Sequence, residues 1–72
     1  DVLDDAVMPA VDYRMTDGLD FDELAAVLRA AVASGRAVGI NITIFNPNLD
    51  PNRSVARNLV GCLRRGLADN AA

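Results

Sequence analysis

The sequence predicts an α/β fold with the order loop, helix, strand, helix along its 72 residues. Two segments with apolar residues three and four apart predict helices at about 20–34 and about 51–69. Between them, a nearly unbroken apolar run at about 37–45 predicts a buried strand. A chain of this length forms at most one small domain, and its core is marginal.

The first helix has clear signals at both of its ends. Asp20 is placed to cap it and Glu23 follows three residues later, as in a capping box. Gly35 suits the left-handed position that ends a helix. The predicted apolar face consists of Phe21, Leu24, Ala25, Leu28, Ala31 and Val32. Before this helix, residues 1–18 lack any periodicity, and we expect a loop there.

The predicted strand is apolar or small on both of its sides, which is typical of a strand inside a parallel sheet. Val38, Ile40, Ile42 and Ile44 alternate with small, polar or aromatic residues. Burial of each large apolar residue stabilises a fold by roughly 1.5–3 kcal/mol. The chain supplies no second strand to pair with this one. We therefore expect the chain to self-associate through the strand at 37–45.

The second helix is predicted to begin at Asp50-Pro51, with Asp50 as the cap and Pro51 at the first helical position. Val55, Leu59, Leu63 and Leu67 recur four residues apart and predict the apolar face. Gly61 interrupts the helix, either as a weak point or as a place of close packing. Cys62, the single cysteine, is interpreted as a core residue rather than a reactive thiol.

Composition excludes several classes of function. Seven basic residues, all Arg, face ten acidic ones, and the net charge of −3 predicts no nucleic-acid partner. No apolar run approaches the roughly 20 residues of a membrane span. With an acidic start and no signal peptide, we expect a cytoplasmic protein. The first residue is not Met, as in an excised or trimmed piece, and the absence of His removes many kinds of catalysis from this chain alone.

The stretch DVLDDAVMPAVDYRMTDGL, residues 1–19, resembles a segment of the arginase and agmatinase family, the ureohydrolases, which includes formimidoylglutamases. That family carries Asp-x-Asp-x-x-Asp-Pro and then Gly-Gly-Leu before a helix. Asp1 matches the second Asp, Asp4 the third, and Gly18-Leu19 the end of Gly-Gly-Leu. Farther on, Asn46-Pro47 matches the family's Glu-x-Asn-Pro.

The resemblance implies that residues 1–72 are the C-terminal part of a ureohydrolase-like domain in a longer enzyme. It implies a three-layer α/β/α fold with a mainly parallel sheet and two manganese ions at the strand ends. The metal-bound hydroxide of that family attacks a guanidinium carbon. In the intact protein, Asp1 is then expected to bind metal, and Asp4 and Asn46 to line the substrate rim or orient the loop. From spacing alone, the same acids read as a solvated terminus.

Four positions depart from the family pattern. Asp5 and Arg14 stand where Pro is expected, Asp17 replaces a Gly, and Ile44 replaces the Glu that faces the substrate guanidinium. No carboxylate lies between residues 39 and 49 to take its place. We therefore expect either that another acid of the longer protein holds the substrate or that the substrate is another small guanidino or amidine compound.

Two functions remain open from the sequence. The first is a segment of a manganese-dependent, arginase-like hydrolase of guanidino or amidine C–N bonds, inactive by itself and binding no ion alone. The alternative is a small αβα module that self-associates without catalysis. An upstream segment in the same reading frame with His and Asp-x-His-x-Asp motifs would favour the enzyme.

Overall fold

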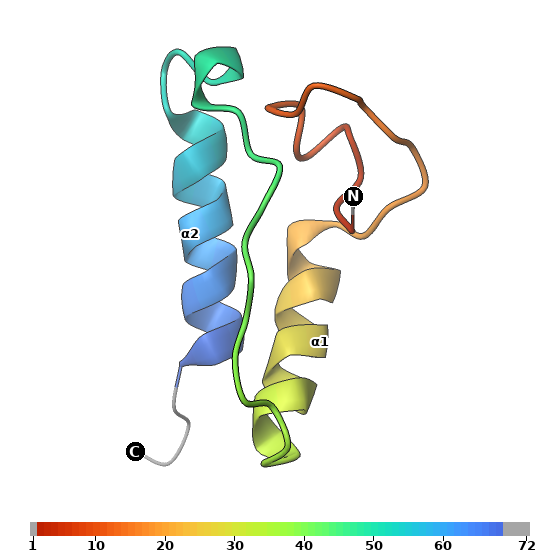
Figure 1. Cartoon of the computed structure of the whole chain (residues 1–72), viewed down its shortest axis with the longest axis vertical. Coiled ribbons are helices and arrows are strands. Elements are labelled where there is room, and N and C mark those ends of the chain that lie inside the picture. Colours follow the sequence, from red (N-terminus) through yellow and green to blue (C-terminus); the bar gives the residue numbers. More distant parts are fainter. Residues whose placement is uncertain (1, 69–72) are drawn as a thin grey trace.

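Two α-helices and one short 3-10 helix make up the helical structure of this computed structural model, which describes residues 2–68. Helix α1 spans Phe21–Ala33, the 3-10 helix η1 spans Pro47–Leu49, and helix α2 spans Ser54–Leu67. Figure 1 shows α1 and α2 running in the same direction, with residues 36–46 returning between them. We call residues 36–46 the extended segment. Residues 2–18, the N-terminal segment, lie near the end where both helices begin.

Helix α1 forms where its local signals predict it. The Asp20 carboxylate accepts a hydrogen bond from the Glu23 backbone N–H at 2.7 Å, and the Glu23 carboxylate accepts one from the Asp20 N–H at 3.0 Å. This is the predicted capping box. At the other end, Gly35 has a φ of 71°, which glycine adopts without strain.

Helix α2 begins later than predicted, at Ser54 rather than at Pro51. Its N-cap residue, Arg53, has a left-handed φ of 63° and no side-chain cap. Asp50 nevertheless caps the first turn of the helix, although it lies four residues before Ser54. Its carboxylate accepts hydrogen bonds from the N–H groups of Val55 at 3.1 Å and Ala56 at 2.8 Å. The prediction placed the right capping side chain but missed the turn between it and the helix. The predicted end at 69 lies outside the described residues.

The predicted α/β fold with a parallel sheet is wrong for this chain. Residues 2–68 contain no strand and no sheet. The β-type pairing in this range is one isolated parallel bridge between Leu3 and Leu19. The predicted strand at 37–45 is instead an unpaired stretch of the extended segment, so residues 2–68 do not form the predicted three-layer α/β/α architecture.

A missing backbone partner explains why no strand forms. Strand hydrogen bonds join separate segments, whereas helix bonds are local. Within residues 2–68, no backbone hydrogen bond joins residues 37–45 to another segment. Val38 is fully exposed, Ile42 is 55% exposed, and Ile44 leaves the β region with a φ of 76°. Much of the predicted burial energy of this run is therefore not obtained.

A small core lies between the helices and the N-terminal segment. Its buried apolar residues are Met8, Ala10, Ala25 and Cys62. Burial of Cys62 confirms the prediction that it is a core residue. The helices approach closely at Gly66, where a Cβ atom would lie 2.6 Å from the Leu28 Cβ. Gly61 has no such neighbour within 4 Å, so it is not the place of close packing.

The N-terminal segment closes on itself. The Asp4 N–H donates to the Leu19 carbonyl at 2.8 Å, and the Leu19 N–H donates to the Val2 carbonyl at 2.8 Å. Gly18 permits this approach, because a Cβ there would overlap the backbone of Leu3 and Asp4. No helix within the described residues is long and apolar enough to cross a membrane.

Candidate functional site

The carboxylate of Asp4 is engaged by the backbone of the N-terminal segment. It accepts the Ala6 N–H at 2.9 Å and the Gly18 N–H at 3.3 Å. The Ala6 bond is the largest cause that holds the pKa of Asp4 below its ordinary value. Asp4 thus joins the start of the segment to its end, next to the bridge between Leu3 and Leu19.

Asn46 connects the extended segment to the N-terminal segment. Its backbone N–H donates to the Ala10 carbonyl at 2.7 Å, and its side-chain amide donates to the Asp12 carboxylate at 2.8 Å. The amide oxygen accepts the Asn48 N–H at 3.0 Å, which starts η1. The two stretches that carry the resemblance, residues 1–19 and Asn46-Pro47, are therefore in direct contact.

Asp12 is a site residue that the sequence did not reveal as one. It lies 34 residues from Asn46. In the sequence it is one of several acidic residues in an N-terminal segment without periodicity. No local spacing rule joins two residues so far apart, so only the folded chain identifies the pair.

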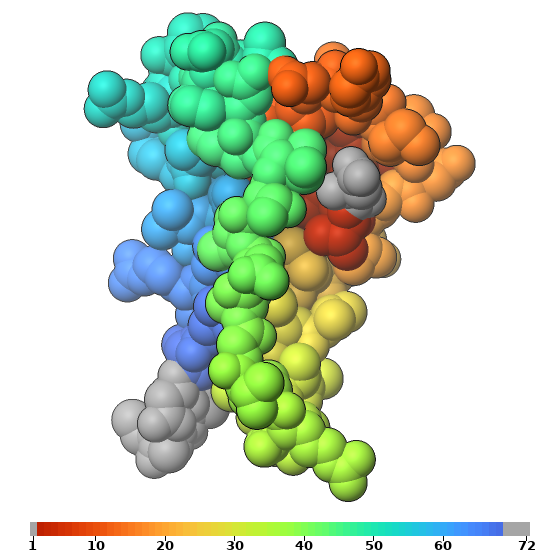
Figure 2. Space-filling model, in the orientation of Figure 1, coloured from red at the N-terminus to blue at the C-terminus, as the bar shows by residue number. Residues whose placement is uncertain are grey.

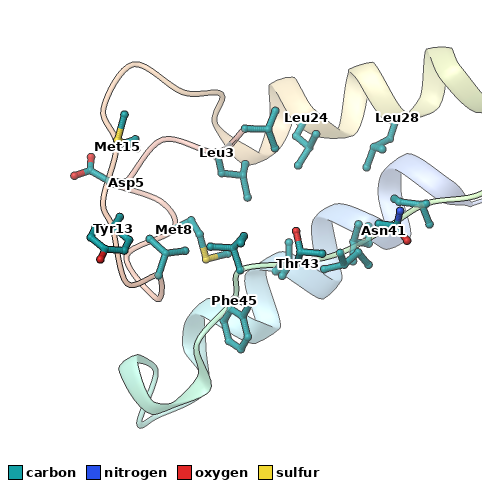
Figure 3. A pocket seen from close by; sticks show the side chains of 17 residues that line it. Leu3, Asp5, Met8, Tyr13, Met15, Leu24, Leu28, Asn41, Thr43 and Phe45 are labelled. Carbon is teal, nitrogen blue, oxygen red and sulfur yellow. The ribbon is translucent and has the colours of Figure 1, made fainter.

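A pocket of about 310 Å³ lies between the N-terminal segment, the extended segment and the two helices. Figure 3 shows Leu24 and Leu28 of α1 pointing toward the extended segment, where Asn41 and Thr43 lie. Most of the lining is apolar. The exceptions are Asp5, Tyr13, Asn41 and Thr43. An apolar pocket with a few polar groups is the usual form of a small-molecule site.

Two departures from the family pattern pair with each other beside this pocket. The Arg14 Nε lies 3.3 Å from the Asp5 carboxylate, and the Arg14 guanidinium also donates to the Asp5 carbonyl at 3.2 Å. Asp5 carries the one carboxylate among the described residues of the lining. Since Arg14 already neutralises it, the pocket offers little free negative charge.

Ile44 lies on the pocket lining and is 57% exposed. Its φ of 76° is strained for a β-branched residue. No charge comes from this position, which is the family's Glu position. The neighbouring polar side chains of Asn41 and Thr43 are neutral hydrogen-bonding groups.

The described residues do not fit a manganese centre by themselves. Asp1, the predicted metal ligand, lies outside them. Within residues 2–68, no three His, Cys, Asp or Glu side chains gather as an ion site. The nearby carboxylates of Asp4, Asp5 and Asp12 are already bonded to backbone N–H groups, to Arg14 and to Asn46.

The model of the arginase family matches residues 1–65. The chain therefore belongs to the arginase family, which confirms the membership predicted from its motifs. A formimidoylglutamase from Aromatoleum aromaticum (strain DSM 19018 / LMG 30748 / EbN1) is 38% identical over 71 residues. This similarity covers 94% of the chain and 21% of the relative, so the chain spans about a fifth of that relative's length. No solved structure matches the chain.

Proposed function

We propose that the chain is the C-terminal segment of a ureohydrolase-class enzyme that hydrolyses a C–N bond in a linear amidine, with a formimidoyl group as the favoured substrate class. The observation that carries the proposal is the family match over residues 1–65, joined to the similarity to a formimidoylglutamase. The contact between the two motif stretches through Asn46 supports it.

Ile44 favours a formimidoyl group over a guanidino group. A substituted guanidinium carries five N–H donors, which need acceptors when water is excluded. A formimidoyl group has a hydrogen in place of one amino group, so it has fewer donors to satisfy. An isoleucine in place of a glutamate removes acceptors from the site. The neutral polar lining near Ile44 agrees with this smaller demand.

The proposal includes the two manganese ions of the family, held in the longer protein. Asp1 is the ligand that this chain would contribute, because manganese prefers hard anionic oxygen. Asp4 and Asn46 would act on the same region by orienting the N-terminal segment that follows Asp1. The other ligands would come from parts of the protein beyond this chain.

Substrate preference in the full-length protein tests the proposal. We expect formimidoyl-glutamate to be hydrolysed with a higher kcat/KM than arginine or agmatine. Ile44→Glu should shift the ratio of the two kcat/KM values toward the guanidino substrates by roughly tenfold or more, since it restores an acceptor for the extra donors. If the unmodified enzyme already prefers arginine or agmatine, the assignment to a formimidoyl substrate is wrong.

Metal content tests the role of Asp1 separately. Asp1→Ala in the full-length protein should lower bound manganese and turnover together. Asp22→Ala, which removes an exposed carboxylate on α1, is the control and should keep both. Full manganese occupancy in the Asp1→Ala protein would show that Asp1 is not a ligand.

A further inference from the structure

Asn46 is held on two sides by hydrogen bonds. Its side-chain amide nitrogen donates to the Asp12 carboxylate at 2.8 Å, and its amide oxygen accepts the Asn48 N–H at 3.0 Å. Its backbone N–H donates to the Ala10 carbonyl at 2.7 Å. Figure 2 shows the N-terminal segment, in red to orange, lying against the green end of the extended segment. These bonds fix Asn46 between the N-terminal segment and the start of η1.

The bond between Asp12 and Asn46 joins two walls of the pocket. The residues directly before and after Asp12 line the pocket from the N-terminal segment. Ile44 and Phe45, which directly precede Asn46, line it from the extended segment. Asp12 and Asn46 are not part of the lining themselves. The pair therefore sets the spacing of the two walls without contacting what lies between them.

The two walls differ in how they are held. In the N-terminal segment, the Asp4 carboxylate accepts two backbone N–H groups, and the Arg14 Nε lies 3.3 Å from the Asp5 carboxylate. Ile44, on the other wall, has a φ of 76°, which costs energy for a β-branched residue. Such a conformation persists only where nearby contacts determine the backbone. The bonds of Asn46, two residues further on, are contacts of this kind.

We propose that Asp12 is a positioning residue of this site, which holds Ile44 in place through Asn46 and so sets the fit of the substrate. This inference rests on the proposed function, because Ile44 is the residue that favours a formimidoyl group there. Catalytic rates depend steeply on substrate position, and a displacement of about 1 Å can lower a rate by roughly 100-fold. Asp12 acts on the rate through the position of Ile44, not by touching the substrate.

Two measurements on the full-length protein test this role, and both compare Asp12→Ala with Asp12→Asn. Asp12→Ala removes the acceptor of the Asn46 amide, so we expect roughly tenfold faster hydrogen exchange in the peptide that contains residues 44–49. We also expect kcat/KM to fall by roughly tenfold or more. Asp12→Asn keeps an oxygen acceptor at this position, so both values should stay close to those of the unmodified protein.

An exchange of the two side chains tests the pair directly. Asn46→Asp places two carboxylates together with no donor between them, and kcat/KM should fall by roughly tenfold or more. Adding Asp12→Asn to this variant returns a donor, because the amide at position 12 can donate to the carboxylate at position 46. We expect the double variant to recover most of the loss. It also keeps the test decisive if Asp12→Ala fails to fold.

The kinetics use whichever of formimidoyl-glutamate, arginine and agmatine the unmodified protein hydrolyses best, so a wrong substrate assignment leaves this test intact. If the protein hydrolyses none of them, the proposed function fails and hydrogen exchange alone decides the role of Asp12. The positioning role is overturned if Asp12→Ala leaves the exchange of residues 44–49 or kcat/KM unchanged, or if Asp12→Asn is as impaired as Asp12→Ala. It is also overturned if the double variant is no better than Asn46→Asp alone.

Discussion

At the scale of single residues, two aspartates organise backbone that regular structure does not satisfy. Asp4 accepts N–H groups at both ends of the N-terminal segment, and Asp50, 5% exposed, accepts two N–H groups of the first turn of α2. Carboxylates that accept backbone N–H groups form strong, charge-assisted bonds. Cys62, by contrast, is an uncharged residue of the buried core. Burial raises the pKa of its thiol, which favours the protonated form.

The bonds of Asp4 predict a pH-dependent stability. Its folded-state pKa is below the ordinary value, so ionised Asp4 stabilises the fold at pH values above about 4. This contribution is lost as the pH falls through the folded-state pKa. We expect Asp4→Asn to lower the thermal midpoint at pH 7, and the difference from the unmodified chain to shrink progressively below about pH 4. Thermal unfolding of the variant and of the unmodified chain, followed by circular dichroism at pH 7 and below about pH 4, measures this difference in midpoint.

Asp17→Asn is the control for Asp4. Asp17 has a left-handed φ of 66°, which asparagine tolerates. This variant should therefore unfold like the unmodified chain at pH 7. An Asp4→Asn midpoint equal to that of the control would show that the carboxylate does not hold the segment.

At the scale of elements, packing between α1 and α2 matters more than their ion pair. Arg65 and Asp22 approach to 2.5 Å, but their side chains are 48% and 84% exposed, and exposed pairs of this kind contribute little. The contact at Gly66 is different. A Cβ there would meet Leu28 and lie 3.2 Å from the Ala25 carbonyl oxygen, so the helix spacing depends on the absence of a side chain.

Two glycines of α2 should respond in opposite ways to alanine. Gly66→Ala should destabilise the chain by about 1–3 kcal/mol, because overpacking outweighs the gain in helix propensity. Gly61→Ala has nothing within 4 Å to meet and should stabilise the chain by up to about 1 kcal/mol. Urea unfolding of both variants gives the two free energies. Equal effects of the same sign would contradict the predicted close contact.

At the scale of the whole molecule, the chain leaves much of its most apolar run exposed. About half or more of the surface of each large aliphatic residue in this run is exposed, namely Val38, Ile40, Ile42 and Ile44. The buried apolar residues among those described are Met8, Ala10, Ala25 and Cys62. A folded chain of this size has only a marginal core. Within the described residues, this run therefore contributes little burial to the core.

The isolated chain should have no hydrolase activity. It contains no His, and the described carboxylates of the candidate site are already bonded within the fold. A binuclear site needs more ligands than Asp1 alone can add. We expect no manganese-dependent product from formimidoyl or guanidino substrates with the purified 72-residue chain, while the full-length protein serves as the positive control. Measurable turnover by the short chain would refute this.

Features that depend on near neighbours were predictable from the sequence. The capping box at Asp20, the position of α1 and the burial of Cys62 follow from residues a few positions apart. Family membership followed from motif residues at a specific separation. The contact of Asn46 with Asp12 was not predictable, because it joins residues 34 positions apart. The start of α2 at Ser54 was not predicted either, because a turn separates Asp50 from the N–H groups that its carboxylate accepts.

The sequence by itself determined that there are two helices and approximately where each lies, because the hydrogen bonds of a helix are made within its own segment. It also determined the arginase family through its motifs. Only the tertiary structure determined whether residues 37–45 form a strand. Their pattern predicts a strand, but a strand exists only where a second backbone accepts its hydrogen bonds. Within the described part of the chain, no segment does so, and the run remains extended and unpaired.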